Sequence, residues 1–366
     1  MLRNLKQLGR WLAIAVVVGL VCCAVAPAAK PVKPPKPVTP AYTVVPFFMV
    51  TPPEGYQSEA SFVCDLNKAG RAVGWERFQK EDGSEESWGL YLDTKTDGCT
   101  PVRVPGARLA TGINNLNQIV GDKGIFGGAF WRDPDDGAPV DLPPLWGDTL
   151  GIPRAINDAG MVVGNSLYIA DGGQIFLSTP VAWRVAVDEN DNVSVEEPVP
   201  LPLPAYAPEA CAVALSELSN GSFHVAGICD PEDGPDEAIA WTVAVNDDGT
   251  FTPGPAVSLV ENHAWSTGNG INIHGDACGH VDYMPFVAPV GQTAQLLPVP
   301  RYTVSGVAHG INNLSQIVGS VEIQTKNWAN GTNGVFAYLW KEDGSAIDLT
   351  AQIDPAAGWG RQIGRA

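Results

Sequence analysis

Positive charge is scarce in this chain. Only 22 Lys and Arg residues stand against 40 Asp and Glu residues, and the formal net charge is −18. Binding to a phosphate backbone needs clustered Lys and Arg, so the composition argues against a nucleic-acid partner. Charged residues make up only 17% of the chain and apolar residues 45%, which excludes a disordered polypeptide. We therefore expect a folded, acidic protein.

Familiar catalytic motifs are missing as well. The sequence contains no Gly-x-Ser-x-Gly elbow, no His-Glu-x-x-His zinc motif and no phosphate-binding glycine loop. The Ser-x-Asp-x-Gly-x-Thr-Trp boxes of six-bladed sialidases are also absent. The sequence accordingly assigns no catalytic residue, no cofactor and no metal ligand, and it favours a protein that is not an enzyme.

Long hydrophobic runs are confined to the first 28 residues. Three basic residues precede an apolar stretch from Trp11 to Val25, and Ala26-Pro27-Ala28 follows as a small-residue cleavage site. The stretch falls short of the roughly 20 residues that a spanning helix needs. We interpret residues 1–28 as a cleaved signal peptide; a retained anchor and lipidation at Cys22 or Cys23 are the alternatives. The expected location is secreted, periplasmic or at the cell surface, with no integral membrane segment after cleavage.

Beyond this segment the chain has few cysteines, and their number is odd. Cys211 and Cys229 lie symmetrically about Asn220-Gly221, a dipeptide typical of hairpin turns. Residues that face each other across a hairpin are within disulfide range, and an exported protein keeps such a bond. The sequence therefore predicts a Cys211–Cys229 disulfide. It assigns no partners to the remaining three cysteines, which are Cys64, Cys99 and Cys278.

Glycine and proline are abundant, with 40 and 31 residues, and many of the glycines belong to a repeat. Each copy has an apolar residue, then Asn, then a turn, then an apolar run that ends in Gly. Five clear copies begin at Leu66, Ile113, Ile156, Ile271 and Ile311. A degenerate copy, read from Leu218 to Gly227, brings the number to six, and the mean spacing is roughly 49 residues.

The repeat is the sequence of a β-hairpin. Asn opens the turn through its side-chain amide, and Gly or Asn two or three residues later accepts a positive φ angle. The two adjacent apolar residues of the return strand indicate that both of its faces are buried. The residues assigned to these turns are Asn67, Gly70, Asn114, Asn117, Asn157, Gly160, Asn272, Gly275, Asn312 and Ser315.

A second hairpin follows each copy. Its first strand is aromatic, as in Ala129-Phe130-Trp131, and its last strand is short, as in Ile347-Asp348-Leu349. Four short strands in roughly 49 residues match one blade of a β-propeller. We predict an all-β fold, a β-propeller of six four-stranded blades, with seven blades and an incomplete last one as the alternative.

The domain boundaries follow from these segments. Residues 29–41 form a Pro/Lys-rich spacer, and residues 42–350 form the propeller domain. The strand-like segment from Tyr42 to Phe47 is expected to close the ring on the last blade. The C-terminal tail, residues 351–366, is a second candidate for that role.

The repeats resemble a known family. The segments 112–121 and 310–319, with their aromatic strands, are similar to the HAF repeat of extracellular bacterial proteins. The resemblance implies a β-propeller-like repeat fold and an extracellular location. The histidine of the family's His-Ala-Phe strand is replaced here, for example by Gly128. The family has no settled activity, so the resemblance implies no substrate.

Three sets of residues are candidates for chemistry. Asp276, Cys278, His280 and Asp282 alternate along one strand, but a single ion reaches at most two of them, because alternate residues lie roughly 6.6 Å apart. Asp65, Glu217 and Asp282 depart from the repeat and would supply carboxylates for glycoside hydrolysis if they face the channel. Four tryptophans lie outside the aromatic strands and are candidates for stacking on sugars: Trp146, Trp265, Trp328 and Trp359.

The sequence thus favours an exported binding or interaction module without catalysis, whose partner is a surface glycan or protein. A glycan-active hydrolase or lyase that uses channel carboxylates is the alternative. A passive structural or adhesive component is a further alternative.

Overall fold

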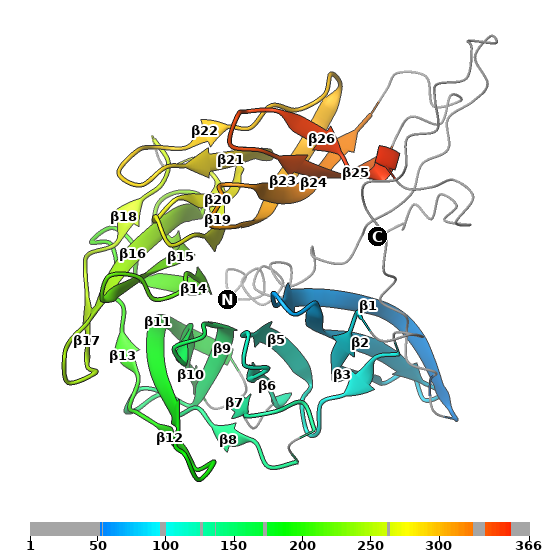
Figure 1. Ribbon diagram of the computed structural model, residues 1–366, viewed down its shortest axis with the longest axis vertical. Helices are drawn as coiled ribbons and strands as arrows, with labels where there is room; N and C mark the ends of the chain where they lie inside the picture. Colours follow the sequence, from blue (N-terminus) through cyan, green and yellow to red (C-terminus); the bar gives the residue numbers. More distant parts are fainter. Residues whose placement is uncertain are drawn as a thin grey trace.

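Six antiparallel sheets surround a central axis in the chain, which makes it a six-bladed β-propeller (Figure 1). The computed structural model describes residues 52, 54–95, 100–124, 127–135, 137–170, 174–261, 264–324 and 334–352. The expected all-β class and blade number are confirmed. Within the described residues, no helix is long and apolar enough to span a membrane.

Each blade is continuous in sequence, and its first strand lies nearest the axis (Figure 1). Blade 1 consists of β1 (Tyr56–Leu66), β2 (Arg71–Lys80), β3 (Glu85–Asp93) and β4 (Val102–Arg103). Blade 2 consists of β5 (Leu109–Ile113), β6 (Ile119–Asp122), β7 (Gly128–Trp131) and β8 (Val140–Asp141). Blade 5 consists of β19 (Ser266–Ile271), β20 (Ala277–Val281), β21 (Met284–Ala288) and β22 (Gln295–Leu296). Blade 6 consists of β23 (Thr303–Ile311), β24 (Ile317–Ile323), β25 (Gly334–Trp340) and β26 (Ala346–Asp348), after which a 3-10 turn spans Thr350–Gln352.

Blades 3 and 4 each have five strands, because their third strands are long enough to pair with two short ones. Blade 3 consists of β9 (Leu150–Ile156), β10 (Met161–Ala170), β11 (Gln174–Val187), β12 (Val193–Val195) and β13 (Val199–Pro200). Blade 4 consists of β14 (Glu209–Leu215), β15 (Ser222–Asp230), β16 (Glu237–Val245), β17 (Phe251–Pro253) and β18 (Val257–Ser258). Both added strands, β12 and β17, extend the outer rim (Figure 1).

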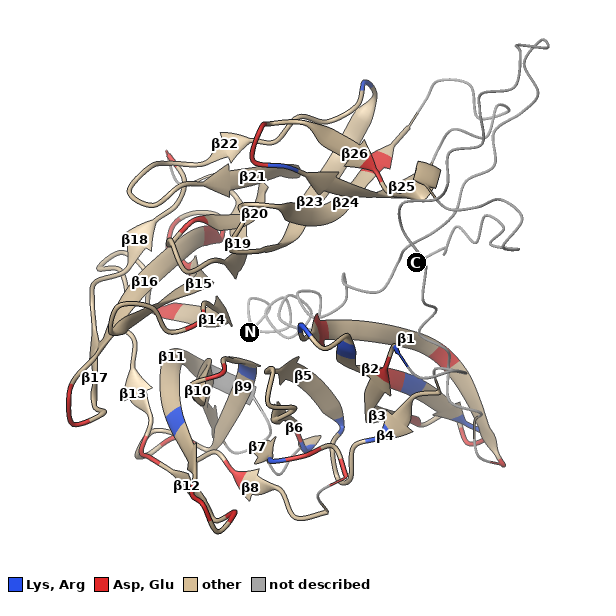
Figure 2. Cartoon of the chain, in the orientation of Figure 1, with Lys and Arg blue, Asp and Glu red and all other residues tan. Residues whose placement is uncertain are grey.

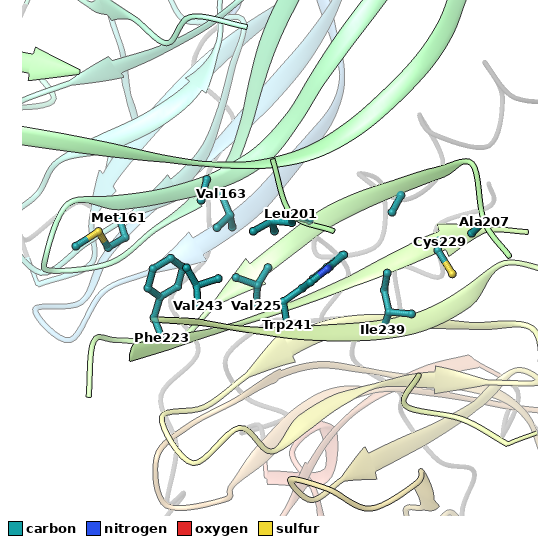
Figure 3. Close-up of a cluster of buried hydrophobic side chains, with 13 residues drawn as sticks. Met161, Val163, Leu201, Ala207, Phe223, Val225, Cys229, Ile239, Trp241 and Val243 are labelled. Atoms are coloured by element: carbon teal, nitrogen blue, oxygen red, sulfur yellow. The ribbon is translucent and has the colours of Figure 1, made fainter. Parts of the chain in front are cut away.

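The second strands of blades 1 to 5 are buried on both faces, as the paired apolar residues indicate; in β24 of blade 6 this prediction is wrong, because Ile317 is buried but Val318 is 47% exposed. In β10, Val162 packs into a cluster with Val120 and Phe130 of blade 2. Its neighbour Val163 packs instead against blade 4, in the cluster of Phe223 and Trp241 that Figure 3 shows. Each such buried side chain contributes about 2 kcal/mol, and the contacts join one blade to the next.

Four buried tryptophans in the third strands each form a hydrogen bond to the connecting segment that leads from the preceding blade into their own. Trp131 donates its indole N–H to the carbonyl of Pro105 at 2.8 Å. The same bond joins Trp183 to Pro143, Trp241 to Pro202 and Trp340 to Pro298, at 2.7, 2.8 and 2.7 Å. A buried indole N–H needs an acceptor, so these bonds fix the position of each connecting segment against a buried tryptophan.

The degenerate repeat starts earlier than its sequence suggests. In blade 4 the hairpin joins β14, ending at Leu215, to β15, and Ser216 stands where the other copies have Asn. Ser216 accepts a hydrogen bond from the backbone N–H of His224 at 2.9 Å. The segment from Leu218 to Gly221 is therefore an enlarged turn and not the start of the repeat.

The predicted Cys211–Cys229 disulfide is wrong, because both thiols are free in the structure. The hairpin is symmetric about Asn220 only near its turn, where Leu215 faces Val225. A β-bulge between Ala212 and Ala214 then shifts the register by one residue, so that Cys211 faces Ile228 and Cys229 faces Ala210. A one-residue shift places the two side chains on opposite faces of the sheet.

Several predictions fall outside the described residues. These are the signal peptide, the Pro/Lys spacer, the strand-like segment from Tyr42 to Phe47, Cys99, Trp328, Trp359 and the tail beyond Gln352.

Candidate functional site

A pocket of about 960 Å³ lies on the axis and is lined by residues from all six blades. Its size is at the upper end for a small-molecule site. The innermost strands and the turns that follow them supply most of the lining. Trp265, His280 and Tyr283 of blade 5 and Ile228 and Asp236 of blade 4 supply the rest.

Every innermost strand has a β-bulge at the same place in the repeat, three residues before the repeat Asn or its replacement Ser216. A bulge leaves one residue outside the paired ladder and redirects it, a device common beside binding sites. In this propeller each unpaired residue lines the axial pocket: Cys64, Thr111, Arg154, Val213, Asn269 and His309.

The bulge also explains the glycine that ends each repeat. A Cβ on Gly121 would overlap the carbonyl oxygen of Leu109, which lies two residues before the bulged Thr111. The other five repeat glycines meet the equivalent carbonyl in the same way, so only glycine fits at Gly74, Gly164, Gly227, Gly279 and Gly319.

The repeat asparagines hold the turns and the blades together. Asn114 accepts hydrogen bonds from the backbone N–H groups of Leu116 and Gln118 inside its own turn, both at 3.0 Å. Its amide donates to the carbonyl of Asn157 in blade 3 at 3.0 Å. Asn67 bonds Asn114, Asn157 bonds Ser216 and Asn272 bonds Asn312 in the same manner. The third turn residues have positive φ at Gly70, Asn117, Gly160, Gly275 and Ser315. These residues therefore form the frame around one end of the pocket.

The residues directly after the asparagines form a second set of bonds between neighbouring blades. The backbone N–H of Asn115 donates to Asp158 at 2.7 Å, and that of Asp158 donates to Glu217 at 2.9 Å. In blades 5 and 6, Ile273 donates to Asn313 at 3.2 Å. Side chains at this position thus form hydrogen bonds that join the turns of adjacent blades.

Two of the three carboxyl groups proposed for hydrolysis line the pocket, and each accepts backbone N–H groups. Asp65 lines the pocket, but its oxygens accept the backbone N–H groups of Ile113 and Leu66 at 2.9 and 2.8 Å. Glu217 also lines the pocket and is held by Asp158. Burial raises the pKa of both carboxyls, and the bonds from backbone N–H groups oppose that rise. Asp282 lies in a turn with φ 46° and is not part of the lining.

An aromatic group covers the side of the pocket formed by blade 5. The ring of Trp265 lies 4.6 Å from that of His280 and 4.7 Å from that of Tyr283, measured between ring centres. The Nδ1 atom of His280 is 2.8 Å from the hydroxyl of Thr267, whereas its Nε2 atom is buried without a partner among the described residues. Of the four proposed stacking tryptophans, Trp265 alone lines the pocket within the described chain, and Trp146 is fully exposed elsewhere.

Two histidines of this region are kept neutral by burial. Burial lowers the pKa of His280 to about 4. Burial, with a smaller contribution from nearby His280, lowers the pKa of His309 to about 4. Both line the pocket, which indicates that its wall in blades 5 and 6 is poorly solvated.

The alternating strand residues do not form a metal site. Cys278 is fully buried in the core between blades 5 and 6, and Asp276 accepts hydrogen bonds from Asn272 and Val290. Among the described residues, no group of three or more potential ligands is placed to hold an ion.

The sequence pattern did not reveal the bulge positions. The signal was nevertheless present: the residue three positions before each repeat Asn differs from copy to copy, as Cys, Thr, Arg, Val, Asn and His. The residue that follows it is Gly or Ala in five of the six copies, so the bulged position varies more widely than its neighbour.

Comparison with known proteins gives no family. No protein-family model matches the chain, and no curated protein matches it in sequence, so the HAF resemblance stays a prediction. Among solved structures, a Bacillus megaterium levansucrase variant has 10% identity and a TM-score of 0.35, covering 80% of this chain and 85% of its own. The α-L-arabinofuranosidase PaAbf62A from Podospora anserina has 13% identity and a TM-score of 0.35, covering 77% and 91%. At these TM-scores the similarities assign no function to this chain.

Proposed function

We propose that this protein is an exported β-propeller that binds a glycan in its axial pocket without catalysing a reaction on it. The observation that carries the proposal is the set of six bulges, which place one variable residue from each blade on the wall of a single pocket. A structural ring alone would not need different residues at equivalent positions.

The chemistry of the wall supports a sugar ligand. A sugar ring presents C–H groups that pack on aromatic faces, and Trp265 and Tyr283 offer such faces on the wall. Its hydroxyls need donors and acceptors. Thr267, Asn269 and Ser305 line the same wall and each already forms a hydrogen bond within the protein, whereas the Nε2 atom of His280 is buried there without a partner among the described residues. Binding is favoured over hydrolysis because Asp65 and Glu217 are committed to backbone N–H groups.

An array of neutral and acidic oligosaccharides tests this function. We expect the wild-type protein to retain at least one class of glycan and Trp265→Ala to bind it at least tenfold more weakly, since stacking on an aromatic ring is lost. The matched control is Trp146→Ala, because Trp146 is fully exposed and outside the pocket.

A second variant separates binding from folding. Val213→Trp keeps every polar group of the pocket but fills part of its volume from the bulge of β14. It should also reduce glycan retention. Retention that depends on Trp146 and not on Trp265 or Val213, or an array on which no glycan is retained, would contradict the proposed function.

A further inference from the structure

We propose that the axial pocket selects acidic glycans, and that Arg154 pairs with the carboxylate of a uronic acid unit. This inference rests on the proposed function and adds the class of ligand.

Arg154 is the bulged residue of β9, so it is displaced from the sheet ladder onto the wall of the pocket. It is half-buried. Figure 2 shows acidic residues gathered on the outer rim near β12 and β17, whereas the innermost strand β9 carries a basic residue, and Arg154 is the only Lys or Arg in that strand. The cation therefore lies toward the axis, away from most of the acidic surface.

Within the described chain, Arg154 forms no ion pair with a carboxylate. The ion pairs of blade 3 that the structure contains use other residues, such as Arg184 with Glu196 at 3.2 Å. The electrostatic neighbours of Arg154 include the thiols of Cys64 and Cys211. Burial raises the pKa of both thiols, that of Cys64 to about 12, so neither supplies a negative charge near neutral pH.

The other acidic groups on the pocket wall are engaged. Asp65 and Glu217 accept backbone N–H groups, and Asp236 has an interaction of its own. Lys68, the other cation on the wall, acts on Glu217, whose pKa its charge lowers against the larger effect of burial. Arg154 is thus half-buried and has no ion pair with a carboxylate in the described chain, so a carboxylate of a ligand can pair with its guanidinium.

The geometry of the guanidinium favours a carboxylate. Its planar fork of N–H donors matches two carboxylate oxygens, giving two parallel hydrogen bonds. One guanidinium balances one negative charge, and Asp65 and Glu217 also line this pocket, so a singly charged carboxylate is repelled less than a doubly charged phosphate. Trp265, Tyr283 and Asn269 on the same pocket wall suit a sugar ring, so the ligand that satisfies both features is a sugar acid.

The test uses two probes that differ only in charge: trigalacturonate and its fully methyl-esterified form. Titration calorimetry on the intact protein should give at least tenfold tighter binding for the acid than for the ester. Binding of the acid should weaken with added NaCl, whereas binding of the ester should not.

Variants at Arg154 make the assignment specific. In Arg154→Gln the acid should bind no more tightly than the ester, whereas Arg184→Gln, at a cation of blade 3 outside the pocket, should keep the wild-type preference for the acid. Arg154→Lys should retain part of the preference, because it keeps the charge but loses the planar fork.

Three results would overturn the inference. These are equal binding of acid and ester by the wild type, a preference for the acid that persists in Arg154→Gln, and no binding of either probe. A wild type that binds the ester or a neutral glycan equally well would leave the proposed function standing, whereas an empty glycan array would remove both.

Discussion

At the scale of single residues, the repeat Asn does more than open a turn. Asn114 is only 3% exposed and its side chain serves two N–H groups of its own turn and one carbonyl of the next blade. The turn role could be predicted from the sequence, because Asn followed by a residue with positive φ is a local pattern. The bond to the next blade could not, since it depends on how the blades stack.

Asn114→Ala should lower the free energy of unfolding by about 3 kcal/mol, because buried donors and an acceptor lose their partner. The matched control is Asn312→Ala in blade 6, where Asn312 is exposed and its amide donates only to Gln316 in the described chain. Denaturant unfolding followed by tryptophan fluorescence compares the two. Equal losses in both variants would show that the bond between blades contributes nothing.

The buried histidines predict a dependence of stability on pH. The pKa of His309 is about 4 in the folded protein, below its ordinary value of 6.5, so the unfolded chain binds the proton more readily. The contribution of His309 to the free energy of unfolding is fully present above pH 6.5. It is lost as the pH falls toward 4, by at most about 1.4 kcal/mol per pH unit. Burial raises the pKa of Asp65 and Glu217, so over part of this range these two carboxyls increase the stability of the folded protein as the pH falls.

His309→Gln isolates the histidine's contribution, since the carboxyl groups are common to both proteins. Unfolding measured at pH 7 and pH 5 should show a smaller loss of stability in the variant than in the wild type. Identical losses would mean that His309 is already protonated in the fold or is solvated.

At the scale of elements, the inner strand, its bulge and the glycine of the second strand form one unit. The sequence predicted the hairpins, the aromatic third strands and the short fourth strands, because each has a local signature in residue type and spacing. It did not predict the bulge, since one extra residue in a short strand only blurs the alternation. That single residue is why Cys211 and Cys229 fail to meet and why the six bulged residues of the pocket wall were not predicted, whereas Asp65, Glu217 and Trp265 were.

Gly121→Ala tests this unit. A Cβ there would overlap the carbonyl oxygen of Leu109, and either the bulge or the strand pair must move, at a cost of about 3 kcal/mol. Gly310→Ala in β23 is the control, because its Cβ would meet nothing closer than the side chain of Val318 at 3.9 Å. Thermal unfolding should separate the two variants by several degrees. A Gly121→Ala protein as stable as Gly310→Ala would contradict the role assigned to the bulge.

At the scale of the whole molecule, repetition and variation have separate roles. The repeated residues build the ring: asparagines bond one turn to the next, tryptophans hold the links, and apolar pairs fill the space between blades. The varied residues at the bulges give the ring a pocket whose wall carries Arg154, which forms no ion pair with a carboxylate in the described chain. The blade count was predictable from the period of the repeat. The pocket was not, because its wall is assembled from positions some 40 to 60 residues apart.

The most direct test of a glycan-binding axial pocket is a crystal structure of the intact protein grown with trigalacturonate. The account predicts electron density for the sugar on the axis, with one carboxylate in contact with the guanidinium of Arg154 and a sugar ring against Trp265. Density confined to the outer rim, for example beside the exposed Trp146, with an empty axis, would contradict it.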